Sequence, residues 1–329
     1  MKVTLDYARI QDESVRPGFG EVRTALSGNL FSPQSATGEQ RGDSPASNSL
    51  TLDEVRTYYN DKTARILKRY GPGPRVHYHT GFGDELEPSD VPAEALRRRL
   101  VSGQERILEH AAQTWDAATY LSGEVLDVGC GLGGGSLFWA QKFGASVTAV
   151  TCVPAHVKLV REFAEMVGVA SRVQPVVADV LELDGRNCFD AAVAVDSSCH
   201  LPRREWFQRL AELLRPNGRV FISDCLLGRP EYEDSFNRYW RARIGTVAEY
   251  LEAARAAGFE PLVVDNLSSR VRDFFATIEA LVKLEARAAG SDAAEAERCA
   301  GSLRQHRNLH QGLGNGGYVY VQMSLVKKR

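Results

Sequence analysis

Val125-Leu-Asp-Val-Gly-Cys-Gly-Leu-Gly-Gly134 is the stretch that decides the fold of this chain. A short apolar run leads into an acidic residue and a glycine-rich turn, and the residues after the turn have helical character. Glycines remove side chains where a backbone must approach a ligand, and the next helix presents its amino end to that ligand. The stretch therefore predicts a strand, a nucleotide-cofactor turn and a helix, without naming the cofactor.

The rest of the chain continues this pattern of apolar segments alternating with helical ones. Five strands are expected near residues 125–128, 146–150, 173–177, 190–195 and 219–223. Such alternation predicts an α/β protein with a doubly wound, mostly parallel sheet that helices cover on both faces. Residues 259–264 and 318–326 supply two further strands, which we expect to pair antiparallel, giving seven in all.

Composition favours a soluble, globular protein over several other classes. The 329 residues are 43% hydrophobic and 25% charged, with a formal net charge of -2, so no broad basic field is available for nucleic acid. No apolar run approaches the ~20 residues that span a bilayer, and the first residues lack a secretory signal, so we expect a cytoplasmic protein without a membrane partner. The six cysteines lack zinc-site spacing, and no metal held by protein side chains alone is expected.

Three regions are expected along the chain. Residues 1–49 are rich in Ser, Gly, Pro and Gln and are predicted to be a mobile N-terminal segment. Residues 50–118 are predicted to form a helical lid that binds substrate, with helices over about 50–69 and 93–115. Residues 119–329 are predicted to form the cofactor-binding core, with a helical cap insertion at about 270–310.

Two interpretations of the glycine turn compete. Gly129, Gly131 and Gly134 satisfy the loose dinucleotide fingerprint, which also requires an acidic residue about 20 positions further on. The second expected strand ends in Thr151-Cys152 instead. Asp127 lies where the amino-acid end of S-adenosyl-L-methionine would lie, and Asp179 closes the third strand, where an adenine edge would lie. The core therefore resembles that of a class I S-adenosylmethionine-dependent methyltransferase.

This resemblance implies a set of cofactor-binding residues at the turn and at the strand ends, joined by one residue of the preceding helix. The set is Asp127, Gly129, Cys130, Gly131, Gly133, Thr151, Cys152, Asp179, Val180 and Gln104.

The acceptor chemistry is expected where the fourth strand ends. Methyl transfer from a sulfonium needs in-line approach and exclusion of water, and reacting atoms in such a sheet meet beyond the carboxyl ends of the strands. Asp196 and His200 follow the fourth strand. Asp196 is the candidate general base, unless it only orders its turn or touches the cofactor. His200 could orient the substrate or relay a proton, and a packing or capping role is equally open.

Residues 50–326 resemble the prenyl-diphosphate C-methyltransferases, such as geranyl diphosphate 2-C-methyltransferase and isopentenyl diphosphate methyltransferases, and more distantly the sterol C-methyltransferases. Besides the core, the segment from Asp196 to His200, Tyr58-Tyr59, His77-Tyr-His-Thr-Gly81 and the final strand carry the resemblance. Those enzymes usually have Glu where this chain has Asp196. The resemblance implies methylation of an alkene carbon, a carbocation held by aromatic faces and a carboxylate that removes a proton.

The resemblance also implies substrate-binding residues, which we expect in two groups. Aromatic candidates for the cation are Tyr58, Tyr59, Tyr239, Trp240 and Phe274, although at least half of the aromatic residues in these regions should simply pack the lid. Candidates for the diphosphate are Arg75, His77, Tyr78 and His79, with Lys62, Arg65 or Arg238 as further cations. Magnesium could bridge the diphosphate oxygens.

Two other functions are left open by the residues. One is O-, N- or C-methylation of another small metabolite, such as an aromatic or indole alkaloid. The other is a non-catalytic or cyclase-type protein that binds the cofactor without methyl transfer. The small-molecule substrate is the one partner expected in all cases, and self-association is an open expectation because residues 50–115 are amphipathic.

Overall fold

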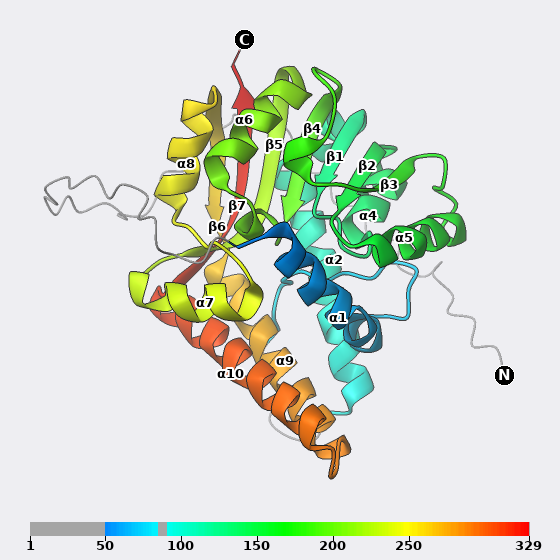
Figure 1. Cartoon of the computed structure of the whole chain (residues 1–329), viewed down its shortest axis with the longest axis vertical. Coiled ribbons are helices and arrows are strands. Elements are labelled where there is room, and N and C mark those ends of the chain that lie inside the picture. The colour runs from blue at the N-terminus through cyan, green and yellow to red at the C-terminus, as the bar shows by residue number, and fades with distance from the viewer. Residues whose placement is uncertain (1–49, 85–90, 329) are drawn as a thin grey trace, which may run out of the picture. The chain divides into compact units, whose positions relative to one another are not determined.

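The computed structural model describes residues 50–84 and 91–328 (Figure 1). The predicted mobile segment, residues 1–49, lies outside the described residues. Seven strands form one sheet in the order β3-β2-β1-β4-β5-β7-β6. The strands are β1 (Glu124–Val128), β2 (Ser146–Thr151), β3 (Val173–Val177), β4 (Phe189–Val195), β5 (Leu214–Leu227), β6 (Phe259–Asn266) and β7 (Tyr318–Lys327).

The sheet is parallel except at one strand. Strands β1 to β5 pair parallel to one another, whereas β7 is antiparallel to both β5 and β6. The expected doubly wound, seven-stranded fold with an antiparallel last strand is therefore confirmed. The order turns back between β1 and β4, which is the point where such sheets open a crevice beyond their carboxyl ends.

Helices cover both faces of the sheet and its carboxyl edge. Beyond short 3-10 turns they are α1 (Leu52–Tyr70), α2 (Ala93–Thr114), α3 (Ala117–Tyr120), α4 (Gly134–Phe143), α5 (Pro154–Met166), α6 (Arg203–Leu213), α7 (Glu233–Trp240), α8 (Val247–Ala256), α9 (Ser268–Ala288) and α10 (Ala293–Asn315). Neighbouring residues of β1 belong to opposite cores: Val125 packs with α2 and α4, and Leu126 packs with α6 and α8. Two-sided burial explains why the central strands β1 and β4 are mainly apolar.

Helix α1 begins as the sequence predicts. The Thr51 side chain accepts a hydrogen bond from the Glu54 backbone N–H, and the Glu54 carboxylate accepts one from the Thr51 backbone N–H, which is a capping box. The helix then crosses the carboxyl edge of the sheet (Figure 1), where the Arg56 Nε donates to the Cys152 carbonyl at 2.9 Å.

The predicted cap insertion consists of two long helices, α9 and α10, which pack side by side beyond the carboxyl edge of the sheet (Figure 1). Helix α1 is joined to them by an ion pair between Arg69 and Glu285, with 2.5 Å between nitrogen and oxygen and both side chains mostly buried. Among the helices that the structure describes, none is long and apolar enough to cross a membrane.

Residues 75–83, here called the strap, run between α2 and the glycine turn. The Gln104 side chain holds the strap from α2, with its Nε2 donating to the His79 carbonyl at 2.7 Å. On the other side the strap touches the first turn of α4: a Cβ added to Gly134 would lie 2.5 Å from the His77 Nδ1 and 2.6 Å from the Val76 carbonyl oxygen. Only glycine lets the two backbones approach so closely.

Gly134→Ala should therefore lower the free energy of unfolding by about 1–3 kcal/mol, because backbone atoms of the strap cannot move aside without cost. Gly135→Ala is the matched control, since its Cβ would meet nothing closer than 3.7 Å. Urea unfolding of both variants without cofactor measures the difference. Equal stability of the two variants would show that the strap is not packed on α4 in this way.

Candidate active site

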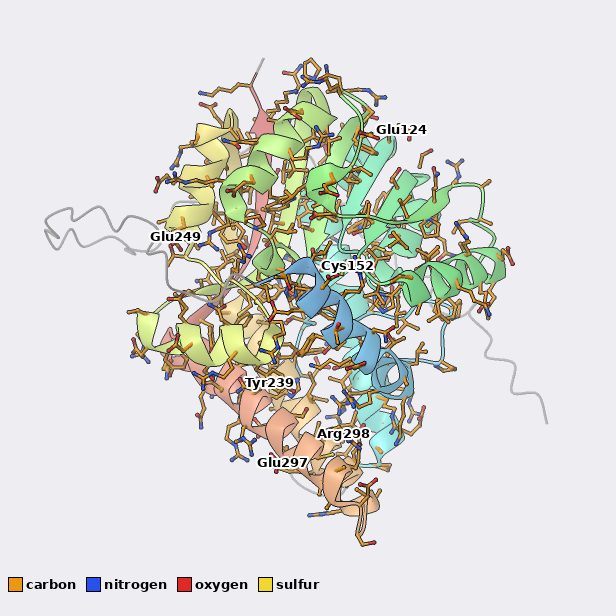
Figure 2. The ribbon with its side chains drawn as sticks, viewed as in Figure 1. Glu124, Cys152, Tyr239, Glu249, Glu297 and Arg298 are labelled. Atoms are coloured by element: carbon orange, nitrogen blue, oxygen red, sulfur yellow. The ribbon has the colours of Figure 1, made fainter. Side chains whose placement is uncertain are left out.

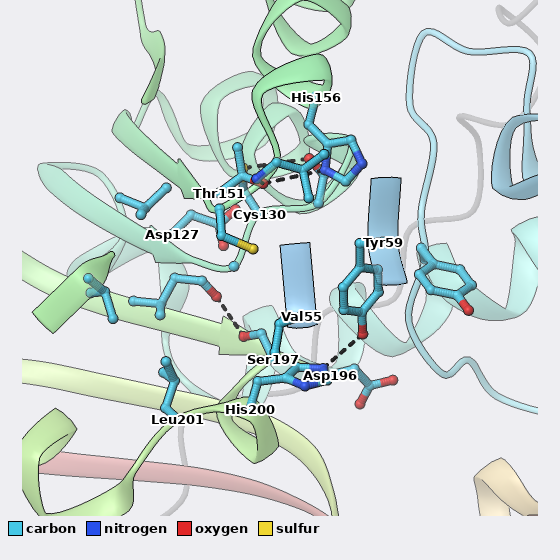
Figure 3. A pocket seen from close by; sticks show the side chains of 18 of the residues that line it. Val55, Tyr59, Asp127, Cys130, Thr151, His156, Asp196, Ser197, His200 and Leu201 are labelled. Carbon is cyan, nitrogen blue, oxygen red and sulfur yellow. Dashed lines mark hydrogen bonds between the residues drawn. The ribbon is translucent and has the colours of Figure 1, made fainter. Parts of the chain in front are cut away.

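A cavity of about 280 Å³ opens at the carboxyl ends of β1 to β4, under α1 and the strap (Figure 3). The glycine turn forms one wall. Gly129 has a φ of +73°, and a Cβ there would lie 2.6 Å from the Ser197 Cβ. Gly131 has a φ of +54°, and a Cβ there would meet nothing within 4 Å, so the backbone of the turn faces open space. This is the geometry that a ligand lying against the turn requires.

Asp127 supplies a buried carboxylate at the end of β1. It is 5% exposed, and its Oδ2 accepts a hydrogen bond from the Ser136 Oγ at 2.5 Å. Burial raises the pKa of Asp127 to about 6, although the Ser136 hydrogen bond opposes the rise. A carboxylate held this way fits the ammonium of an amino-acid moiety, because the pairing offsets the cost of burying the charge.

The ends of β2 and β3 complete the cofactor side of the cavity. Thr151, Cys152, Asp179 and Val180 all line it, as predicted from their places at the strand ends. The Asp179 carboxylate also accepts from the Leu181 backbone N–H at 2.9 Å, which fixes the turn after β3. These placements agree with a cofactor lying along the strand ends, and the individual contacts stay predictions.

Helix α1 is latched over the cavity by side chains on one face. The Tyr59 hydroxyl lies 2.8 Å from the His200 Nε2, and the Thr63 Oγ1 lies 2.9 Å from the His156 Nε2. The His200 Nδ1 lies 2.7 Å from the Arg241 carbonyl oxygen. Because a carbonyl can only accept, Nδ1 carries the hydrogen and Nε2 accepts from Tyr59. Desolvation lowers the pKa of His200 to about 4, so the ring is neutral at pH 7.

A second cavity of about 80 Å³ adjoins the first, and Asp196 lines both. The Asp196 carboxylate accepts hydrogen bonds from the Thr80 backbone N–H at 2.5 Å and the Tyr320 hydroxyl at 2.9 Å. Its backbone has a φ of +47°, a conformation that non-glycine residues seldom adopt. Burial raises its pKa. The sequence prediction thus located an acid at the boundary between the two cavities.

Seven aromatic side chains line the second cavity, which we call the aromatic cavity. They come from α1, the strap, α7 and α9, and comprise Tyr59, Tyr70, Tyr78, Phe236, Trp240, Phe274 and Phe275. The Trp240 Nε1 is buried without a hydrogen-bond partner in the part of the chain that the structure describes. Tyr70 and Phe236 were not predicted. Trp206, on α6, packs in the core and is fully buried.

Asp224 is a site residue that the sequence prediction missed. It lies within β5 and lines the aromatic cavity, and its carboxylate accepts from the Ser198 Oγ at 2.6 Å and the Cys225 backbone N–H at 2.8 Å. Burial first, and then the charge of Asp196, raise the pKa of Asp224 to about 7. An acid directly after the apolar run Val220-Phe-Ile222 and Ser223, followed by Cys225-Leu-Leu227, is the signal that could have identified it.

The predicted diphosphate ligands are not gathered into a free cationic site. The Arg75 Nε and the His77 Nε2 both contact the Glu105 Oε1, at 3.0 and 2.8 Å, so one carboxylate from α2 already engages both side chains. The His79 Nε2 lies 3.1 Å from the His77 Nδ1, and burial lowers the pKa of His79 to about 3. Arg75 lines none of the three cavities described in this subsection.

Three further predicted site residues lie outside the linings of these cavities. Gln104 is fully buried and holds the strap through backbone carbonyls, so its place is beside the site rather than in it. Gly133 caps α4 against Val160. Tyr58 lies beside Lys62, and the Lys62 Nζ is 3.9 Å from the centre of the Tyr58 ring. The remaining aromatic candidate, Tyr239, lines a third cavity of about 240 Å³ next to Lys62.

No group of three or more His, Cys, Asp or Glu side chains that could hold a metal ion occurs within residues 50–84 and 91–328.

Comparison with known proteins identifies the core. Residues 125–218 match the family model of the methyltransferase domain. Methyltransferase phqN of Penicillium fellutanum is 26% identical over 56% of this chain and 57% of its own length. The chain spans about half the length of the first curated relatives that it matches.

Geranyl diphosphate 2-C-methyltransferase of Streptomyces lasalocidi is 26% identical over 74% of this chain and 85% of its own length. The crystal structure of geranyl diphosphate C-methyltransferase from Streptomyces coelicolor A3(2), in complex with Mg²⁺, geranyl diphosphate and S-adenosyl-L-homocysteine, has a TM-score of 0.65 and 18% identity over 86% of this chain and all of that one. The resemblance to this type of class I methyltransferase is confirmed, and the chain contains an S-adenosylmethionine-dependent methyltransferase domain.

Asp127→Asn should weaken binding of S-adenosyl-L-homocysteine about tenfold or more, because the amide cannot pair with the ligand's ammonium. The wild-type affinity should fall as the pH drops through about 6, where the carboxylate takes up a proton, and the variant should lack this fall. Isothermal titration calorimetry between pH 5 and 8 measures both effects.

Ser136→Ala provides the directional control for this prediction. The Ser136 hydrogen bond lowers the pKa of Asp127, so its loss should move the fall in affinity to higher pH. Binding by Asp127→Asn that matches the wild type across this range would remove Asp127 from the ammonium site.

Proposed function

We propose that this class I methyltransferase transfers the methyl group of S-adenosyl-L-methionine to an alkene carbon of a prenyl diphosphate or a related terpenoid. The observation that carries the proposal is the position of Asp196, which lines both the cofactor cavity and an adjoining cavity walled by aromatic rings. A donor in the first cavity and an apolar acceptor in the second would meet at this carboxylate.

The aromatic cavity suits a reaction that creates positive charge on carbon. When the alkene attacks the methyl group, the bond from methyl to sulfur breaks and the acceptor becomes a carbocation. Ring faces stabilise a desolvated cation by about 2 kcal/mol. Tyr59 and Tyr78 stand edge to face, with ring centres 6.2 Å apart, on the side shared with the cofactor cavity.

The reaction ends when the cation loses a proton. Asp196 is the proposed acceptor of that proton, and its transfer to the carboxylate restores a carbon–carbon double bond and leaves adenosylhomocysteine and the methylated product. Asp224 lines the same cavity, and burial together with the charge of Asp196 raises its pKa to about 7. Hydrogen bonds from Thr80 and Tyr320 hold the Asp196 carboxylate in place.

Water has to be excluded while the cation exists. The latch of α1 across the cofactor cavity, through Tyr59 and Thr63, serves this purpose. Magnesium would enter with a diphosphate acceptor and belong to that substrate.

A second candidate is N-methylation of a small amine. Buried carboxyls among aromatic rings would also hold an ammonium group. A third candidate is a protein that binds the cofactor without turnover, and it predicts no adenosylhomocysteine release with any acceptor.

The test is release of adenosylhomocysteine by the full chain with dimethylallyl, isopentenyl, geranyl and farnesyl diphosphates, with and without magnesium. A small set of tertiary and secondary amines forms the comparison arm. Turnover of one diphosphate, with the added methyl located on carbon by mass spectrometry, supports the proposal. Turnover confined to amines would overturn it.

Asp196→Asn should reduce turnover at least about a hundredfold while cofactor affinity stays near that of the wild type, because the amide cannot take up the proton. Tyr320→Phe is the control. It removes one hydrogen bond to the carboxylate but leaves the base in place, so it should cost far less. Near-normal turnover by Asp196→Asn would exclude this residue as the base.

A further inference from the structure

We propose that the third cavity, between α1, α7 and α10, binds a phosphate or diphosphate group at one end of the acceptor. That this group belongs to the acceptor of methyl transfer rests on the proposed function. This basic cavity has a volume of about 240 Å³. Its lining includes four basic side chains and one acidic one, and these are Lys62, Arg65, Arg69, Arg298 and Glu295.

The sequence spacing explains why cations gather there. Lys62, Arg65 and Arg69 recur at intervals of three and four residues, so they lie along one face of α1. Arg298 faces them from α10 and Tyr239 from α7. Figure 2 labels these last two side chains, on α7 and α10, near the lower half of α1.

The cavity has more basic side chains than carboxylates that pair with them. Arg69 is paired with Glu285 at 2.5 Å, and Arg298 with Glu295 at 2.7 Å. Lys62 and Arg65 have no carboxylate partner among residues 50–84 and 91–328. Lys62 and Arg65 thus face the cavity without a paired carboxylate, and a phosphate group would supply the counter-charge.

Lys62 is the less exposed of the two unpaired cations. Its Nζ lies over three rings, 3.9 Å from the centre of Tyr58, 4.8 Å from that of Tyr239 and 4.9 Å from that of Trp240. Burial, followed by the charges of Arg65 and Arg69, lowers the pKa of Lys62 to about 7. An anion bound beside it would favour the charged ammonium.

The basic cavity continues directly from the aromatic cavity. Tyr70, Tyr78 and His306 line both, and Tyr78 also lines the cofactor cavity. An acceptor could therefore place an apolar chain among the rings, its reacting carbon near Asp196 and its charged end near Lys62. Arg75 and His77, the ligands expected from the sequence, already share Glu105, which makes the basic cavity the better phosphate site.

Binding of inorganic pyrophosphate to the full chain tests this inference without an acceptor, by isothermal titration calorimetry with and without magnesium. Lys62→Met and Arg65→Gln should each weaken binding about tenfold or more, because each removes a charge-assisted contact. Lys68→Gln is the matched control, since it removes a charge from the same helix outside the cavity lining. Its affinity should stay at the wild-type value.

A pH series gives a second readout that a general loss of structure would not mimic. Between pH 6.5 and 8.5 the wild-type affinity should fall relative to that of Lys62→Met, because Lys62 loses its proton in this range. The other charged or titratable groups that line the cavity are Arg65, Arg69, Tyr70, Tyr78, Tyr239, Glu295, Arg298, Cys299 and His306, and all are retained in both proteins. Binding of S-adenosyl-L-homocysteine by every variant reports that it is folded.

Equal pyrophosphate affinities for Lys62→Met, Arg65→Gln and the wild type would overturn the inference, as would an equal loss in Lys68→Gln. Absence of pyrophosphate binding to the wild type, with and without magnesium, would overturn it too. The outcome is separable from that of the proposed function. Cavity-dependent pyrophosphate binding without turnover of any prenyl diphosphate would leave the phosphate site standing and remove the prenyl acceptor. Turnover of a prenyl diphosphate with the same Michaelis constant in Lys62→Met and the wild type would support the prenyl acceptor and remove the phosphate site.

Discussion

Three aspartate side chains are buried near the edge of the sheet where its parallel strands end, and they constrain the rest of this structure. Asp127, Asp196 and Asp224 come from β1, the end of β4 and β5, and burial raises the pKa of each. Buried acids without cationic partners are costly, so a site that keeps three of them is built for positive charge. The proposed reaction supplies it as the ammonium and sulfonium of the cofactor and then as a carbocation. The aromatic rings of the adjoining cavity would stabilise the same positive charge.

The opposite charge is collected at the other end of the acceptor path. Lys62 and Arg65 on α1 face a cavity that shares Tyr78 with both the aromatic and the cofactor cavities. The site is therefore polarised, with acids where a cation would form and cations where an anion would be held. Helix α1 contributes to both ends, since Tyr59 latches to His200 while Lys62, one turn later, faces the basic cavity.

The sequence predicted the parts of the site that depend on strand ends. The glycine turn, Asp127 and Asp196 were located because polar residues after apolar strands meet at one edge of a parallel sheet. Asp224 was missed because it lies inside β5, whereas the predicted acids lie at or just beyond the carboxyl ends of strands. The contacts of Arg75 and His77 with Glu105 were not foreseen, because Glu105 belongs to a separate helix. The basic cavity depends on α1 meeting α10, more than 220 residues later, which local spacing cannot reveal.

The measurement that tests the central claim most directly compares two acceptor analogues in the presence of S-adenosyl-L-homocysteine. One is a prenyl diphosphate in which a protonated amine replaces the carbon that would carry the charge, and the other is the matching neutral hydrocarbon analogue. A site complementary to the cation should bind the ammonium analogue about tenfold more tightly or better. Equal affinities would contradict the account, because they would mean that the buried carboxyls and aromatic rings do not recognise positive charge on the acceptor.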